Sequence, residues 1–161
     1  MEATVDSDTA IGELVYKYHA SILRLAYAYV KNRQDAEDIT QEVYLAFLGN
    51  SPRFSDDVQL RAWLFKVTGN KCRDFLKSFW HKCTVALPDD LSYLPKTAST
   101  LIRKVWSLDE KYRIPLHLFY YEGYSIQEIA GLLGCSPSTV GTRLDRGRQR
   151  LRAAIGDDFD E

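Results

Sequence analysis

The strongest constraint on the fold is a stretch near the C-terminus, residues 124–152, in which helix-start and helix-stop signals follow one another closely. Ser125 with Glu128 three residues later has the pattern of a capping box, which predicts the start of a helix. Gly134 stands where that helix must end, because glycine adopts the left-handed backbone of a helix terminus without strain. The dipeptide Ser136-Pro137 predicts the cap and first position of another helix. The stretch therefore predicts two short helices joined by a tight turn.

Both predicted helices carry apolar residues at helical spacing, so that each offers an apolar face to the other. These residues are Ile129, Leu132, Leu133, Val140 and Leu144. This is the pattern of a helix-turn-helix, whose second helix enters the major groove of DNA. The second helix is also the most basic run of the chain, with five arginines in residues 143–152 against one acid, Asp145. An ordinary helical hairpin with a solvated arginine face is the alternative interpretation.

Charge is segregated along the chain, although the net charge of its 161 residues is only −1. Residues 35–57 contain six acids against one arginine, and residues 61–82 contain six lysines and arginines against one aspartate. The net charge excludes a uniformly basic nucleic-acid binder. One acidic and two basic surfaces instead predict a protein partner together with a nucleic acid.

Apolar periodicity predicts three helices before residue 82, at about 10–31, 35–48 and 58–81, with Asn32 and Gly49 as stops. One face of the third helix is predicted to carry Leu60, Trp63, Leu64, Val67, Lys71, Phe75 and Phe79.

Basic side chains on the third helix are interleaved with aromatic residues, and Phe54 stands in the polar loop before it. Such a surface suits single-stranded nucleic acid, because bases stack on rings while cations follow the phosphates. The alternative is that the aromatic rings belong to the core and the lysines are solvated, which we adopt for Trp63 and Phe75.

Apolar periodicity fails in residues 83–99, which contain Pro88 and Pro95 and are predicted to form a flexible linker. The predicted fold is therefore all-α, with two small helical domains at residues 10–82 and 100–153, the second carrying the helix-turn-helix.

A short helix is predicted over residues 101–106 at the start of the second domain. Ser107 with Glu110 has the pattern of a second capping box, opening a helix that runs to Tyr121. Pro115 falls inside that helix and is expected to kink it.

Motifs for phosphate-loop, dinucleotide, zinc-protease and serine-hydrolase chemistry are absent from the sequence. We therefore predict no enzyme activity, no cofactor and no small-molecule substrate. The three cysteines, Cys72, Cys83 and Cys135, are scattered and fit reduced thiols better than a disulfide framework or a metal site. The acidic, polar N-terminus and the lack of a long apolar run predict a cytoplasmic protein.

Two stretches of the first half, DAEDITQEVYLAF at 35–47 and LRAWLFKVTGNKCRDFL at 60–76, resemble the first conserved domain of bacterial RNA polymerase sigma factors. Residues 107–152 resemble their second conserved domain. Two domains with only a linker between them are similar to the extracytoplasmic-function (ECF) type of the sigma-70 family. The resemblance implies a dissociable subunit that binds core RNA polymerase and directs promoter-specific initiation.

The resemblance also implies roles for individual residues. The acidic helix would dock on the clamp of the largest polymerase subunit through Asp38, Gln41 and Glu42. The −10 promoter element would be opened, and a flipped base held, by Phe54 and Asn70, with strand or backbone contacts from Arg61, Lys66, Arg73 and Lys77. The −35 element would be read by Ser136, Ser138, Thr139, Thr142, Arg143, Arg146 and Arg148. An anti-sigma factor would be a further partner.

Gly141 occupies a position where the family usually has lysine or arginine, so one DNA contact is expected to be missing. Two alternatives stay open. A stand-alone helix-turn-helix regulator would bind a palindromic operator as a dimer, without polymerase. A nucleic-acid enzyme would need an acidic cluster, for which Glu42, Asp56 and Asp57 are the only candidates.

Overall fold

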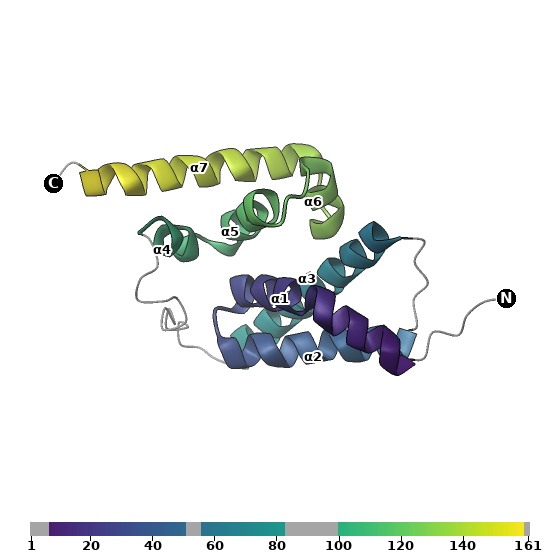
Figure 1. Ribbon diagram of the computed structural model, residues 1–161. Helices are drawn as coiled ribbons and strands as arrows, with labels where there is room; N and C mark the ends of the chain where they lie inside the picture. Colours follow the sequence, from purple (N-terminus) through teal and green to yellow (C-terminus); the bar gives the residue numbers. More distant parts are fainter. Residues whose placement is uncertain (1–6, 51–55, 83–99, 160–161) are drawn as a thin grey trace. The chain divides into compact units, whose positions relative to one another are not determined.

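The computed structural model describes residues 7–50, 56–82 and 100–159, and every regular element in these ranges is a helix (Figure 1). The chain divides into two compact units, residues 1–82 (unit 1) and 83–161 (unit 2). The prediction of an all-α, two-domain protein is confirmed. The predicted linker lies outside the described residues.

Unit 1 is a bundle of three helices, α1 (Ser7–Val30), α2 (Arg33–Asn50) and α3 (Asp57–Lys82), each packed against the other two. All three were predicted from periodicity. Its core includes Leu14, Tyr18, Ile22, Leu25, Tyr29, Ala36, Ile39, Val43, Leu64 and Phe65.

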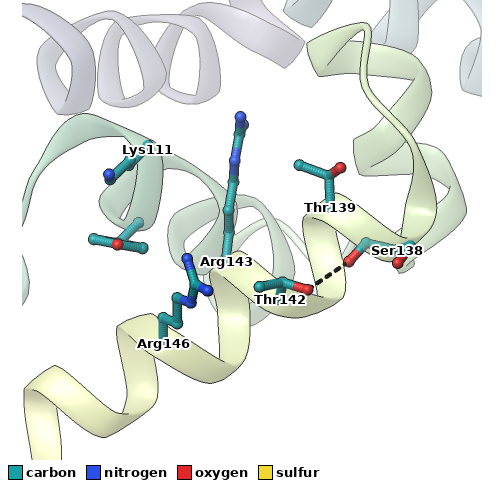
Figure 2. Close-up of a pocket in the computed structure, with 7 residues that line it drawn as sticks. Lys111, Ser138, Thr139, Thr142, Arg143 and Arg146 are labelled. Atoms are coloured by element: carbon teal, nitrogen blue, oxygen red, sulfur yellow. Dashed lines mark hydrogen bonds between the residues drawn. The ribbon is translucent and has the colours of Figure 1, made fainter.

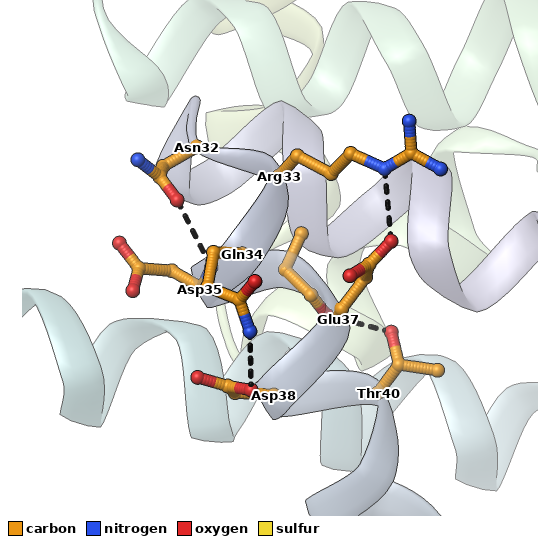
Figure 3. Close-up of polar contacts among 8 residues, drawn as sticks. Asn32, Arg33, Gln34, Asp35, Glu37, Asp38 and Thr40 are labelled. Carbon is orange, nitrogen blue, oxygen red and sulfur yellow. Dashed lines mark hydrogen bonds and ion pairs between the residues drawn. The ribbon is translucent and has the colours of Figure 1, made fainter.

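Two adjacent residues form the turn between α1 and α2. Lys31 adopts the left-handed conformation, with φ of 56°, and its N–H donates to the Tyr27 carbonyl at 2.9 Å. The Asn32 side-chain oxygen accepts the N–H of Asp35 at 3.0 Å (Figure 3). Asn32, predicted as the stop of α1, is therefore the cap of α2, because its carboxamide satisfies one of the unpaired N–H groups there.

The buried face of α3 differs from the predicted one. Its buried residues are Leu64, Phe65, Thr68, Gly69 and Cys72. Of the predicted face, Leu64 is buried, whereas the prediction is wrong for five residues that are only half-buried: Leu60, Trp63, Val67, Lys71 and Phe75. The side chain of Phe79, also predicted on this face, lies outside the described residues. A Cβ at Gly69 would lie 3.3 Å from the Tyr29 hydroxyl oxygen, so α3 meets α1 at small residues. Small residues such as Thr68, Gly69 and Cys72 do not contribute to a pattern of large apolar residues. The buried face of α3 is therefore rotated around the helix axis relative to the predicted one.

Unit 2 begins with α4 (Thr100–Ser107) and α5 (Glu110–Leu116), which continues as the π-helix η2 (His117–Tyr121). The helix-turn-helix follows as α6 (Ile126–Leu133) and α7 (Pro137–Phe159), and α4, α5 and α6 all pack against α7. The core includes Trp106, Tyr112, Ile114, Leu118, Tyr124, Ile129, Val140 and Leu144.

The predicted turn chemistry of the helix-turn-helix is confirmed. The Ser125 hydroxyl accepts the N–H of Glu128 at 3.1 Å, and the Glu128 carboxylate accepts the N–H of Ser125 at 3.1 Å. Gly134 has a left-handed φ of 68°. The Ser136 hydroxyl accepts the N–H of Thr139 at 3.1 Å, which caps α7. The second helix is longer than predicted, since α7 continues to Phe159.

The capping box predicted at Ser107 is wrong. The Ser107 hydroxyl donates to the Lys104 carbonyl at 2.8 Å, because Ser107 still belongs to the last turn of α4. Asp109 is the residue before α5 and makes no side-chain cap. The helix passes through Pro115, and its bonding then changes to the π pattern, with the Glu122 N–H donating to the His117 carbonyl at 3.1 Å.

Gly141 and Gly147 of α7 play different parts. A Cβ at Gly147 would lie 3.0 Å from Leu116 Cδ1 and 3.4 Å from Tyr112 Cβ, so Gly147 lets α5 approach α7 closely. A Cβ at Gly141 would meet nothing within 4 Å. The packing therefore leaves little room for a side chain at position 147 and leaves position 141 open.

We expect Gly141→Ala and Gly147→Ala to affect stability differently. Alanine at 141 should raise the free energy of unfolding by about 0.5–1 kcal/mol, because it restricts the unfolded chain at no steric cost. Alanine at 147 should give no gain or a loss, because Leu116 must move. Urea unfolding of the full chain, followed by far-UV circular dichroism, measures both. Equal gains from the two variants would contradict the packing role of Gly147.

Candidate nucleic-acid interface

An open recess of about 320 Å³ lies on the exposed side of α7 (Figure 2). It is lined by Ser138, Thr139, Thr142, Arg143 and Arg146 of α7 and by Lys111 and Tyr112 of α5. Side chains three or four residues apart share one face of a helix, which is why α7 presents these residues together. Five of the predicted −35 residues are thus brought into one site.

The recess is cationic. Its lining includes Lys111, Arg143 and Arg146 and no acid. The Lys111 ammonium lies 5.0 Å and the Arg150 guanidinium 4.8 Å from the centroid of the Tyr112 ring. Burial acts to raise the pKa of Tyr112, but the positive charges around it, first that of Lys111, lower that pKa overall. Three cations and three aliphatic hydroxyls facing one hollow suit an anion such as a phosphate.

Hydrogen bonds of the first turn of α7 already use some of the predicted contact groups. The Ser136 hydroxyl is 2.8 Å from the Thr139 hydroxyl in addition to capping the helix. The Thr142 hydroxyl donates to the Ser138 carbonyl at 3.0 Å (Figure 2). These bonds hold the hydroxyl groups in fixed directions along the recess, while their remaining lone pairs stay available as acceptors.

Arg148 is not part of the recess. It follows Arg146 by two residues, roughly half a turn of helix. Its guanidinium donates to the Tyr120 hydroxyl at 2.6 Å and to the Asp145 carboxylate at 2.9 Å. It also lies 5.8 Å from the centroid of the Phe119 ring. The hydrogen bond with Tyr120, assisted by Asp145, raises the pKa of Arg148. Arg148 therefore connects α7 to η2.

Four of the predicted −10 residues form one stripe along α3. Lys66, Asn70 and Lys77 are exposed, and Arg73 is half-buried. Their spacing of four, three and four residues places them on one side of the helix. The Arg73 guanidinium donates to the Asn70 side-chain oxygen at 2.5 Å, which fixes the orientation of the amide.

One other predicted −10 residue, Arg61, lies away from this stripe. The Arg61 guanidinium lies 5.1 Å from the centroid of the Phe65 ring, and Arg61 is half-buried. Arg61 also precedes Lys66 by five residues, which places it about 140° away around the helix. Phe54 lies outside the described residues, as do the side chains of Phe79 and Trp80.

The predicted polymerase-binding residues share an exposed face of α2. Asp38, Gln41 and Glu42 are all exposed. The Asp38 carboxylate accepts from the Gln34 amide at 3.2 Å (Figure 3), and the Glu42 carboxylate is 4.0 Å from the Lys71 ammonium. Burial, and then the charge of Asp38, raises the pKa of Asp35.

Residue-type reasoning missed two apolar residues of the same helix. Leu45 is 66% exposed and Leu48 is 44% exposed. Leu45 follows Gln41 by four residues and Asp38 by seven, which puts it on the same face. An apolar side chain framed by polar ones would suit the apolar centre and polar rim of a protein interface. The helical spacing from Asp38 and Gln41 could have revealed it.

Two of the acidic residues that a nucleic-acid enzyme would need, Asp56 and Asp57, make structural contacts instead. The Asp56 carboxylate accepts the N–H of Gln59 at 2.9 Å and caps α3. The Asp57 carboxylate pairs with the Lys17 ammonium. Among the described residues, no group of three His, Cys, Asp or Glu side chains could hold a metal ion. Nor does any helix in those ranges have the length and apolar character needed to cross a membrane.

Two protein-family models match the chain. The model for sigma-70 region 2 matches residues 14–81, and the model for sigma-70 region 4 matches residues 101–151. The chain is 27% identical to the ECF RNA polymerase sigma factor SigW of Bacillus subtilis, covering 92% of this chain and 90% of SigW. It is 30% identical to the RNA polymerase sigma factor SigV of the same species, covering 82% of each chain.

Two solved structures have the same fold. One is the sigma factor RpoE in complex with the anti-sigma factor NepR from Bartonella quintana, with a TM-score of 0.72, 18% identity and coverage of 91% of this chain and 97% of that one. The other is CnrH in complex with the cytosolic domain of CnrY, with a TM-score of 0.67, 24% identity and coverage of 94% and 90%.

Proposed function

Because this chain belongs to the sigma-70 family of RNA polymerase sigma factors, as a member of the ECF group, we propose that its two units read two elements of a promoter while one face of α2 docks on the polymerase. The chain directs promoter-specific transcription initiation, and sigma factors of this family are initiation factors rather than catalysts. Its place of work would be the cytoplasm, where the polymerase transcribes DNA.

The recess on α7 is the observation that carries this proposal. We assign it to the −35 element, with α7 in the major groove of the duplex. Arg143 and Thr142 would face base edges, since they lie in the N-terminal half of the helix. Arg146 lies a turn further on and would contact a phosphate. At the start of α7, the DNA strand would pass the hydroxyl groups of Ser136, Ser138 and Thr139.

The stripe on α3 is assigned to the −10 element. The Asn70 amide, oriented by Arg73, would read the edge of a base that has left the stack. Unstacking a base costs a few kcal/mol, so the contact must offset that cost. Lys66 and Lys77 would follow the phosphates of the same strand. Phe54 would supply a ring beside the base, and Arg61 would support the helix through its contact with Phe65.

The exposed face of α2 is assigned to the clamp of the largest polymerase subunit. Asp38, Gln41 and Glu42 would supply the polar rim of this interface, and Leu45 its apolar centre. We also propose an anti-sigma factor as a partner, because the RpoE structure with the same fold was solved in complex with one. A stand-alone regulator would need unit 2 only, and the match of both sigma-70 regions supports the sigma function instead.

Transcription in vitro with core polymerase and a promoter library tests the function. The chain should direct specific initiation. Asn70→Ala should reduce promoter opening roughly tenfold, equivalent to about 1.4 kcal/mol, while core binding stays unchanged. Permanganate reactivity of unpaired thymines measures opening. Ser78→Ala, an exposed change off the stripe on the same helix, is the control. Equal loss of opening and core binding would show that Asn70 is merely structural.

Arg146→Ala and Arg148→Ala remove the same charge from the two sides of α7. Holoenzyme with Arg146→Ala should bind promoter DNA more weakly, and the slope of log K against log salt should be shallower by about 0.9, as expected for one lost phosphate contact. Arg148→Ala should leave the slope unchanged and lower the free energy of unfolding by about 1 kcal/mol through loss of its hydrogen bonds. A shallower slope of log K against log salt for Arg148→Ala would show that Arg148 contacts DNA after all.

Leu45→Ala tests the docking face. The leucine is exposed in the free chain, so the free energy of unfolding should change by less than about 0.5 kcal/mol. Affinity for core polymerase should fall by more than about 1 kcal/mol, as for a central interface residue. Val58→Ala is the matched control, since Val58 is 67% exposed on α3. Competition binding with labelled chain measures the affinity of each variant for core polymerase, and urea unfolding measures its stability. Similar losses of affinity in Leu45→Ala and Val58→Ala would argue against this face.

A further inference from the structure

The recess has a second wall that the helix-turn-helix does not supply. Lys111 and Tyr112 belong to α5, ahead of the capping box that opens the motif, yet they line the same hollow as Arg143 and Arg146 (Figure 2). Lys111 is exposed, whereas Tyr112 is only 3% exposed. The tyrosine ring therefore forms part of the floor of the recess, and the lysine stands at its rim.

The two walls are held together by tight packing. Gly147 brings α7 so close to α5 that a Cβ would lie 3.0 Å from Leu116 Cδ1. Ile114 and Leu116, from the same helix as Lys111, are buried. The Arg150 guanidinium covers the Tyr112 ring at 4.8 Å. The position of Lys111 relative to α7 is thus set before any ligand binds, which reduces the entropic cost of binding.

The chemistry of the recess indicates what it holds. Three cations from two helices face one hollow that contains no acid, so they repel one another until an anion neutralises them. At about 320 Å³ and open to solvent, the hollow has room for a sugar-phosphate segment of a strand. DNA supplies such anions at regular spacing along each strand.

We propose that Lys111 is a DNA-contacting residue, and that the recess holds a backbone phosphate of the −35 duplex between α5 and α7. Tyr112 is a positioning residue, because its ring makes cation–π contacts with Lys111 and Arg150. This inference rests on the proposed placement of α7 in the major groove. A phosphate contact carries no base information, so Lys111 strengthens binding to every sequence equally.

Lys111→Ala tests this inference in holoenzyme bound to promoter fragments, with fluorescence anisotropy read over a salt series. Affinity should fall about fivefold, the slope of log K against log salt should be shallower by about 0.9, and the loss should be the same on a fragment with a scrambled −35 element. Lys111→Arg should retain binding. Arg152→Ala, which removes an exposed charge of α7 outside the recess, should leave affinity and slope unchanged.

The outcomes separate the inference from the function on which it rests. If wild-type holoenzyme prefers the intact −35 element and Arg146→Ala flattens the slope while Lys111→Ala does not, the inference is overturned and the proposed function stands. If wild-type holoenzyme does not distinguish the two fragments and Arg146→Ala has no effect, both are overturned. A loss at Lys111 confined to one sequence would make it a base contact and would also overturn the proposal.

Discussion

Close approach of helices at glycine sets the geometry of both units. In unit 2, Gly147 allows α5 to lie against α7, so that Lys111 and Arg146 line one recess. In unit 1, Gly69 allows α3 to meet Tyr29 of α1, and the Asn70 stripe lies beside this contact, within about 100° around the helix. Interiors are packed to near-crystalline density, so one added methyl group at such a contact must be accommodated by movement.

The features that were predictable from the sequence are those determined by neighbouring residues. The caps at Ser125 and Ser136 and the left-handed Gly134 depend on a few consecutive positions, and all three are present. The face of α3 was mispredicted because its buried side includes the small residues Thr68, Gly69 and Cys72, to which the spacing of large apolar residues gives no weight. The capping pattern at Ser107 failed because the preceding helix already uses that hydroxyl.

The site was predictable along one helix and not between helices. The family resemblance grouped Arg143 with Arg146 on α7, but nothing local connected them with Lys111, which the fold brings from α5. Helical spacing would also have placed Leu45 on the face of Gln41, four residues earlier. Arg148 was grouped with the other arginines by composition, and its place half a turn away directs it to Tyr120 instead.

The ion pair of Asp145 with Arg148 has a consequence for how such a chain could be tuned. By its charge alone, Asp145 would weaken the positive potential of α7. It is already paired with Arg148, however, which points away from the recess. A change at position 145 would therefore remove a negative charge from the flank of α7 without altering any side chain of the recess. The total charge of α7, which sets its general attraction to DNA, can thus change separately from the recess residues, which would set its preference among promoters.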